Sequence, residues 1–270
     1  MQCYKNAKPT EQIHVLDRAF HYGDGCFTTA RLRGGAIELH DRHLARLHNA
    51  NERLYLHADL SLIQQTLALI QQQHPDASGT LKIIISRGEG QRGYSLPEHP
   101  ADVWVFYYPK LAEDFSYELI QCGVLQQAIG LSMPDLAGLK SLNRLEQVML
   151  KREADQNGWP EALVSDVQGA VAEGVSSNCF IRINNAWITP ELRYNGVHCV
   201  MRAEILSRMQ AQGIACTPRR VDLNEIADFQ SVFFCNALSP MKIVSRLNGA
   251  PLDVQPCAEL FHLLQLNQIR

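Results

Sequence analysis

The sequence lacks a long apolar run and an excess of positive charge. Its 270 residues are 46% hydrophobic and 20% charged, and the net charge is -3. No stretch approaches the roughly 18 consecutive apolar residues of a membrane-spanning helix, and the charge balance lacks the basic excess of a nucleic-acid-binding domain. We therefore expect a globular protein that acts on a small molecule, without a nucleic-acid or membrane partner, folded as one large domain or two smaller ones.

Cysteine pairs at metal-binding or redox spacing are also missing. The eight cysteines are scattered without a CxxC pair, and the polar N-terminus carries no secretory leader, which predicts reduced thiols in the cytoplasm. His40 and His43 lie close to Asp41, but no further His or Cys cluster has zinc-like spacing. We expect solvated imidazoles at these positions and no metal site.

Two short motifs lack the context that their usual functions require. Residues 88–93 have the letters of a dinucleotide-binding GxGxxG, yet Pro97 and Pro100 follow, where that motif needs a helix. The stretch 174–177 lacks the second glycine of a nucleophile elbow. We therefore expect a loop at 88–100, no Rossmann site and no hydrolase triad.

Short strand patterns alternate with helical ones, which predicts a mixed α/β or α+β fold. The expected strands cover residues 27–32, 37–39, 81–86, 103–108, 161–165, 178–183 and 231–235. The expected helices cover 41–55, 60–73, 201–212 and a segment near the C-terminus. Pro109 opens a short polar stretch, so we expect a smaller N-terminal domain over 1–108, a linker over 109–116 and a larger C-terminal domain over 117–270.

Lys140 is the first candidate for chemistry. It follows a glycine, and Leu142, Leu145 and Met149 recur at helical spacing, which places Lys140 at the first turn of an amphipathic helix. The partial positive charge of a helix N-terminus would lower the pKa of that amine. A partly neutral lysine forms Schiff bases with carbonyls such as pyridoxal phosphate (PLP). By position alone a solvated lysine is the commoner case, because lysines are rarely buried.

A protein that uses PLP also needs an acid for the pyridine nitrogen and donors for the phosphate. Glu173 lies in an apolar region before a glycine-containing turn, and is a candidate for the acid; a surface loop acid is the alternative. Arg46 shares a predicted helix with Leu47 and Arg53 and could bind a phosphate bidentately, although most helix arginines are solvated.

Five segments carry a resemblance to a known family. They cover residues 17–31, 43–47, 87–94, 140–148 and 173–180, and their order and spacing resemble those of the fold-type IV PLP-dependent enzymes. This superfamily contains the branched-chain and D-amino-acid aminotransferases, and within it the chain is most similar to the aminodeoxychorismate lyases of folate synthesis. The resemblance implies a two-domain fold of the D-amino-acid aminotransferase-like type, a homodimer, and conversion of 4-amino-4-deoxychorismate to 4-aminobenzoate and pyruvate.

The resemblance also implies a role for each matching residue. Lys140 would bind PLP covalently and then act as the general base, Glu173 would pair with the pyridine nitrogen, and Arg46 would hold the phosphate. The implied phosphate cup is completed by backbone around Val200, Met201, Asn236 and Ala237, and the implied substrate residues are Thr29, Arg87, Arg92 and Leu238. Thr29 would lie near the reacting carbon, and one arginine would bind a carboxylate. Asn178 is expected to brace the turn after Glu173.

Three departures from the superfamily pattern bear on the subclass. Transaminases of this fold usually carry an acid after the phenylalanine of the first motif, where this chain has Thr28, and a tyrosine where it has Arg144. Cys199-Val200-Met201 replaces the more usual Gly-Ile-Thr. These departures favour elimination over amino transfer, with a branched-chain or D-amino-acid transaminase as the alternative and a non-catalytic nucleotide-binding module as a remote one.

Overall fold

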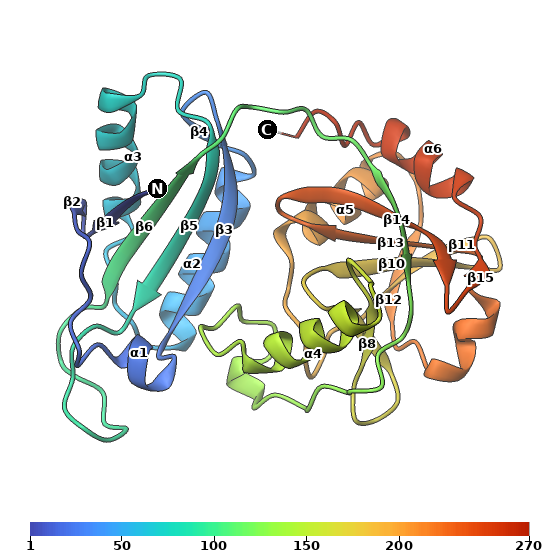
Figure 1. Cartoon of the computed structure of the whole chain (residues 1–270), viewed down its shortest axis with the longest axis horizontal. Helices are drawn as coiled ribbons and strands as arrows, with labels where there is room; N and C mark the ends of the chain where they lie inside the picture. The colour runs from blue at the N-terminus through green and yellow to red at the C-terminus, as the bar shows by residue number, and fades with distance from the viewer. Residues whose placement is uncertain (270) are drawn as a thin grey trace. The chain divides into compact units, whose positions relative to one another are not determined.

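The computed structural model describes residues 1–269, which form two compact units (Figure 1). The N-terminal unit comprises residues 1–113 and 139–143, and the C-terminal unit comprises 114–138 and 144–269. The chain first passes from one unit to the other within the segment 109–116 and then contributes 139–143 to the N-terminal unit. The division into domains 1–108 and 117–270 does not include this return and stays a prediction. Residue 270 lies outside the described residues.

The N-terminal unit is built on a six-stranded sheet in the order β2-β1-β6-β5-β3-β4, with antiparallel pairing throughout (Figure 1). The strands are β1 (Gln2–Lys5), β2 (Lys8–Pro9), β3 (Gly25–Arg33), β4 (Ala36–Ile37), β5 (Gly79–Ser86) and β6 (Asp102–Pro109). The helices are α1 (Arg18–Tyr22), α2 (His40–Arg53) and α3 (Ser61–Gln73).

One face of this sheet forms the core of the N-terminal unit. Buried and half-buried residues alternate along β3, as the period of a strand requires. The buried set packs with Leu47 of α2, with Ile63 and Ile70 of α3, and with Leu81 and Ile83 of β5. Both helices therefore cover the same face, while Phe27 and Thr29 of β3 lie on the other.

The C-terminal unit holds a seven-stranded sheet in the order β12-β11-β10-β13-β14-β15, with β7 paired to β14, and a separate pair, β8-β9. The strands are β7 (Glu118–Cys122), β8 (Leu163–Ser165), β9 (Val171–Gly174), β10 (Asn178–Ile183), β11 (Ala186–Pro190), β12 (Cys216–Arg219), β13 (Ser231–Asn236), β14 (Ser239–Leu247) and β15 (Ala250–Pro251). The helices are α4 (Leu145–Gln156), α5 (Val200–Ala211) and α6 (Gln255–Leu263), with short 3-10 helices η1 (Pro134–Leu136) and η2 (Leu223–Asp228). Phe180 and Phe233 stack in the core with ring centroids 4.8 Å apart.

The expected mixture of strands and helices is confirmed, with two local corrections. The predicted strand at 37–39 ends at Ile37, because Leu39 adopts a left-handed conformation just before α2. The helix predicted around Lys140 begins only at Leu145. Its supposed core stripe is wrong as well: Leu145 is 74% exposed and Met149 40% exposed, whereas Leu150 is buried.

Three further observations concern nucleotide-binding, membrane-spanning and metal-binding features. Residues 87–101 are loop, with no helix after the glycines, so the rejection of a dinucleotide-binding motif is confirmed. Among residues 1–269, no helix has the length and apolar character needed to cross a bilayer. In the same part of the chain, no group of three or more His, Cys, Asp or Glu residues is arranged to hold a metal ion.

Candidate active site

Lys140 lies on an extended segment that pairs with the start of β3. The Phe27 amide donates to the Lys140 carbonyl at 2.9 Å, and the Leu142 amide donates to the Gly25 carbonyl at 3.0 Å. The prediction that Lys140 occupies the first turn of a helix is therefore wrong. A helix dipole is not the cause of any special reactivity at this amine, since α4 starts at Leu145.

Gly25 makes this close pairing feasible. Its φ is +155°, a value that side-chain-bearing residues rarely adopt. A Cβ at this position would overlap the carbonyl oxygen of Ile85 and would lie 2.9 Å from Cδ1 of Leu142. Only glycine thus allows the backbone of 139–143 to lie against β3, and the backbone at Lys140 is fixed by that approach.

The Lys140 side chain lies against the ring of Phe27, with its Nζ 4.6 Å from the ring centroid. Lys82 of β5 approaches the same ring, at 5.2 Å. Thr29 is two residues along β3 from Phe27, which puts both side chains on the same face of the sheet, and Thr29 is directly opposite Lys82 in the strand register. The structure thus brings Lys140 and Thr29 to one face, and adds Lys82, which the sequence motifs did not indicate.

Arg46 of α2 belongs to a small polar cluster with Thr28 of β3 and His43. Its Nη1 donates to Oγ1 of Thr28 at 3.4 Å, and Nδ1 of His43 lies 2.6 Å from the same oxygen. His43 is only 2% exposed, so the expectation of a solvated imidazole is wrong for this residue. The helical spacing of His43, Leu47 and Ala50 already contained the signal, because all three belong to the buried stripe of α2.

The two arginines expected at the substrate differ in surroundings. Arg87 is buried, and its guanidinium donates to the Asp24 carboxylate and to the carbonyls of Leu54 and Tyr55. Arg92 lies in the loop after β5 and is exposed. Because the donors of Arg87 already bind protein groups, this network favours a structural role for Arg87 and leaves Arg92 as the better carboxylate ligand.

Glu173 is a buried acid of β9, 5% exposed, so a surface loop acid does not describe it. Its Oε2 accepts from Nδ2 of Asn178 at 3.0 Å and from the amide of Val197 at 2.8 Å. Oδ1 of Asn178 accepts in turn from the Cys199 amide at 3.2 Å. Asn178 thus connects the carboxylate to the start of α5, whereas its expected role of bracing the turn after Glu173 stays a prediction. Hydrogen bonds to the ionised form stabilise a carboxylate.

Gly196 leaves room for this carboxylate. Its φ is +73°, and a Cβ there would lie 3.1 Å from Oε2 of Glu173. Arg144 is also near: burial lowers the pKa of its guanidinium, and the charges of Glu173 and Glu146 oppose that shift. Arg144 thus supplies positive charge near Glu173 at the position where the superfamily pattern has a tyrosine.

The expected phosphate cup consists of backbone. The side chains of Val200 and Met201 are buried, and no side chain caps the start of α5. The turn after β13 is held by Asn236, whose Oδ1 accepts from the amides of Leu238 and Ser239. The amides in the first turn of α5 suit an anion, as helix N-termini do. Since the Leu238 amide is already bonded to Asn236, the Ala237 amide is the better donor of that turn.

Glu161 is a buried residue near this cluster that sequence reasoning missed. Its carboxylate accepts from the amide and hydroxyl of Ser176 and from the hydroxyl of Ser177, and it thereby fixes the turn after Glu173. Asn236 donates to the Ser176 carbonyl, at 3.5 Å. No motif in the sequence marks Glu161, because its partners are distant along the chain.

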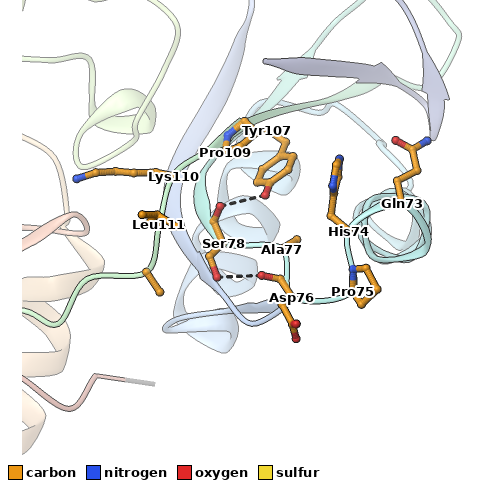
Figure 2. Close-up of a pocket in the computed structure, with 11 residues that line it drawn as sticks. Gln73, His74, Pro75, Asp76, Ala77, Ser78, Tyr107, Pro109, Lys110 and Leu111 are labelled. Atoms are coloured by element: carbon orange, nitrogen blue, oxygen red, sulfur yellow. Dashed lines mark hydrogen bonds between the residues drawn. The ribbon is translucent and has the colours of Figure 1, made fainter.

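A pocket of about 630 Å³ opens on the N-terminal unit between the end of α3 and the end of β6 (Figure 2). Its lining includes His74, Ser78, Tyr107 and Lys110. The Tyr107 hydroxyl donates to the Ser78 carbonyl at 3.0 Å, and the Ser78 hydroxyl donates to the Asp76 carbonyl at 3.2 Å. None of the expected site residues lines this pocket. Of its other polar side chains, Lys110 bonds to Glu113 and His74 to Gln2.

Comparisons with known proteins bear on what these residues do. The chain matches the family "Amino-transferase class IV" over residues 25–247. An aminodeoxychorismate lyase from Vibrio harveyi is 31% identical, over 97% of each chain. The solved structure of 4-amino-4-deoxychorismate lyase from Pseudomonas aeruginosa is 34% identical with a TM-score of 0.84, over 97% of this chain and 96% of that one. A PLP-bound hypothetical aminotransferase from Mycobacterium tuberculosis shares the fold, with a TM-score of 0.81 at 22% identity, over 99% and 98% of the two chains.

Proposed function

We propose that this chain, which belongs to the amino-transferase class IV family, is a PLP-dependent lyase that converts 4-amino-4-deoxychorismate to 4-aminobenzoate and pyruvate. The observation that carries this proposal is the full-length similarity to aminodeoxychorismate lyases, at 31% and 34% identity. Thr28 supports the lyase over a transaminase: it bonds to His43 and Arg46 at the position where transaminases usually carry an acid.

Each unit, taken by itself, offers residues whose chemistry suits PLP. The C-terminal unit offers a buried carboxylate, Glu173, that can face a protonated pyridine nitrogen, and first-turn amides of α5 without a side-chain cap that can face a phosphate. The N-terminal unit offers the amine of Lys140 and the guanidinium of Arg46. When bound, PLP supplies an electron sink that stabilises negative charge on the carbon next to the substrate amine.

We assign three tasks to Lys140. Its Nζ would hold the cofactor between turnovers, would be released when the substrate amine takes its place, and would then take the proton from the carbon that bears that amine. The neighbouring C–O bond would break, the enolpyruvyl group would leave and accept that proton to become pyruvate, and the ring would become aromatic. The backbone at 139–143 is held against β3, which fixes the point from which the Lys140 side chain extends.

Glu173 and Thr29 have supporting tasks in this proposal. The donors Asn178 and Val197 bond to the Glu173 carboxylate and favour its ionised form, and an ionised acid would keep the pyridine nitrogen protonated. The Thr29 hydroxyl, on the same face as Phe27, donates a hydrogen bond near the reacting centre. Arg92 binds a substrate carboxylate, and the first-turn amides of α5 with Ala237 bind the phosphate.

The test supplies two sets of reactants to the purified protein. With aminodeoxychorismate, we expect 4-aminobenzoate and pyruvate; with an amino acid and a keto acid, we expect little amino exchange. Rapid amino exchange without pyruvate from aminodeoxychorismate would contradict the lyase and favour a branched-chain or D-amino-acid transaminase. A colourless protein to which borohydride fixes no PLP would contradict both and favour a non-catalytic binding module.

We also propose that the protein is a cytoplasmic homodimer. Leu145, Val148 and Met149 form an exposed apolar face on α4, which a second copy would cover. Val148→Asp is expected to shift the sedimentation profile toward monomer, whereas the matched control Leu111→Asp, at an exposed leucine of the N-terminal unit, is expected to leave it unchanged. A wild-type profile that is monomeric at working concentration would contradict the homodimer.

A further inference from the structure

His43 is a buried titratable residue to which the proposed reaction gives no task. It lies in the first turns of α2, on the stripe that packs against the sheet, and its Nδ1 is 2.6 Å from Oγ1 of Thr28. That oxygen also accepts a hydrogen bond from Nη1 of Arg46. Thr28 thus stands between an imidazole and the guanidinium that we assign to the PLP phosphate.

The chemistry of the three groups sets the direction of the two hydrogen bonds. A guanidinium only donates, so Oγ1 of Thr28 must accept from Arg46. A hydroxyl that accepts from a cation becomes a better donor, because linked hydrogen bonds polarise one another. This polarisation favours donation from the Thr28 hydroxyl to Nδ1 of His43, an arrangement that requires the imidazole proton to be on Nε2.

The surroundings keep the imidazole uncharged, as an acceptor at Nδ1 must be. Burial, together with the smaller effects of the Arg46 and His40 charges, lowers the pKa of His43 to about 3. An imidazolium would instead turn an N–H toward Thr28 and bring a second positive charge next to Arg46.

We infer that His43 is a positioning residue for Arg46: by accepting from the Thr28 hydroxyl, it aims an oxygen lone pair at Nη1 and holds the guanidinium ready for the cofactor phosphate. This inference rests on the proposed function, since it needs Arg46 to bind PLP. It assigns a specific task to Thr28 as well, at the position where the lyase and transaminase patterns diverge.

The experiment compares the affinities of the PLP-free protein for PLP and for pyridoxal, which lacks the phosphate. Thr28→Val removes the hydroxyl, and His43→Leu removes the acceptor. The measured quantity is the dissociation constant for PLP divided by that for pyridoxal. Each variant is expected to raise this ratio about tenfold, which is the effect of losing a hydrogen bond to a charged group. Thr28→Ser keeps the hydroxyl, and His43→Asn places an amide oxygen where Nδ1 lies, so both should keep the ratio near that of the wild type.

Thr66→Val is the matched control, because Thr66 is buried in the same unit and its hydroxyl donates to the Leu62 carbonyl. It should change thermal stability without changing the ratio. A structural role alone for His43 predicts equal losses of PLP and pyridoxal affinity in His43→Leu, and that result would overturn the inference. So would an ¹⁵N spectrum of the PLP-free protein that shows the His43 proton on Nδ1.

The outcomes also separate this inference from the proposed function. If the wild-type protein does not bind PLP, the proposed function fails and this role for His43 fails with it. If the wild type binds PLP and Arg46→Ala weakens that binding, but the ratio is unchanged in His43→Leu and Thr28→Val, only the inference fails.

Discussion

Lys140 and Glu173, one in each unit, differ in their surroundings. Backbone hydrogen bonds to β3 hold the segment around Lys140, and its amine lies against the ring of Phe27. The Glu173 carboxylate accepts hydrogen bonds from Asn178 and the Val197 amide. Under the proposed function, the residue that exchanges partners lies on a backbone paired to a strand, whereas the residue that keeps its charge and position is bonded at its carboxylate.

Removal of the Lys140 amine is expected to have the largest effect on turnover of the changes to these two residues. Lys140→Ala is expected to lower the turnover number at least about 10³-fold, because it removes both the covalent anchor and the general base. Loss of 4-aminobenzoate formation and of borohydride-fixed PLP would be measured together. Lys82→Ala removes the other amine at the Phe27 ring and should keep covalent PLP. Equal losses in the two variants would contradict the assignment of Lys140.

Glu173→Gln tests the other side of the comparison, because it keeps the shape of the side chain and removes its charge. We expect turnover to fall about 10²-fold, since a neutral amide cannot keep the pyridine nitrogen protonated. Asn178→Ala removes one of the donors to the carboxylate and should cost about tenfold. Turnover measured on protein saturated with PLP separates these effects from cofactor loss. A smaller effect for Glu173→Gln than for Asn178→Ala would mean that the charge is not needed.

Gly196→Ala tests whether the position of the Glu173 carboxylate matters for turnover as well as its charge. The new Cβ would lie 2.7 Å from Cδ2 of Leu192 and 3.1 Å from Oε2 of Glu173, so turnover should fall several-fold. Gly158→Ala is the matched control for backbone strain, with a similar φ of +69° and no atom within 4 Å of its Cβ. Both variants should lose about 1 kcal/mol of stability from the left-handed backbone, and Gly196→Ala should lose more because its Cβ also crowds Leu192. If both lost turnover equally, strain alone would account for the result.

Stability against acid, in contrast to turnover, is expected to depend on His43. The pKa of His43 is lowered to about 3, mainly by burial, so below about pH 6.5 the unfolded chain binds a proton that the folded chain does not. The free energy of unfolding should therefore fall with pH in the window from 6.5 toward 3, by up to about 1.4 kcal/mol per unit from this residue. Urea unfolding at several pH values gives the free energy of unfolding as a function of pH, and in His43→Asn this pH dependence should be weaker by the same amount. An unchanged pH dependence would mean that His43 is protonated in the folded protein.

Sequence patterns were sufficient where local periodicity or a motif carries the information. The helices over 40–53 and 61–73, and the strands on either side of the glycine-rich loop, follow from apolar spacing. Glu173 was identified from its apolar surroundings and its resemblance to a family motif, and its burial agrees with that identification.

Sequence patterns gave wrong or no predictions where contacts between distant parts of the chain determine the local structure. Leu142, Leu145 and Met149 have helical spacing, but the pairing of 139–143 with β3 makes the first of them extended, and α4 begins only afterwards. Glu161 and its serine partners meet only in the folded chain. The wrong prediction for His43 has a different cause: the spacing of His40 and His43 is common on surface helices, but His43 also falls on the buried stripe of α2, which the sequence contains.

The most direct test of the proposed lyase is the stoichiometry of products from aminodeoxychorismate with no amino acceptor added. The account predicts one pyruvate for each 4-aminobenzoate, over many turnovers, by the wild-type protein and none by Lys140→Ala. No pyruvate from the wild-type protein under these conditions, with amino transfer once a keto acid is supplied in a second assay, would contradict it.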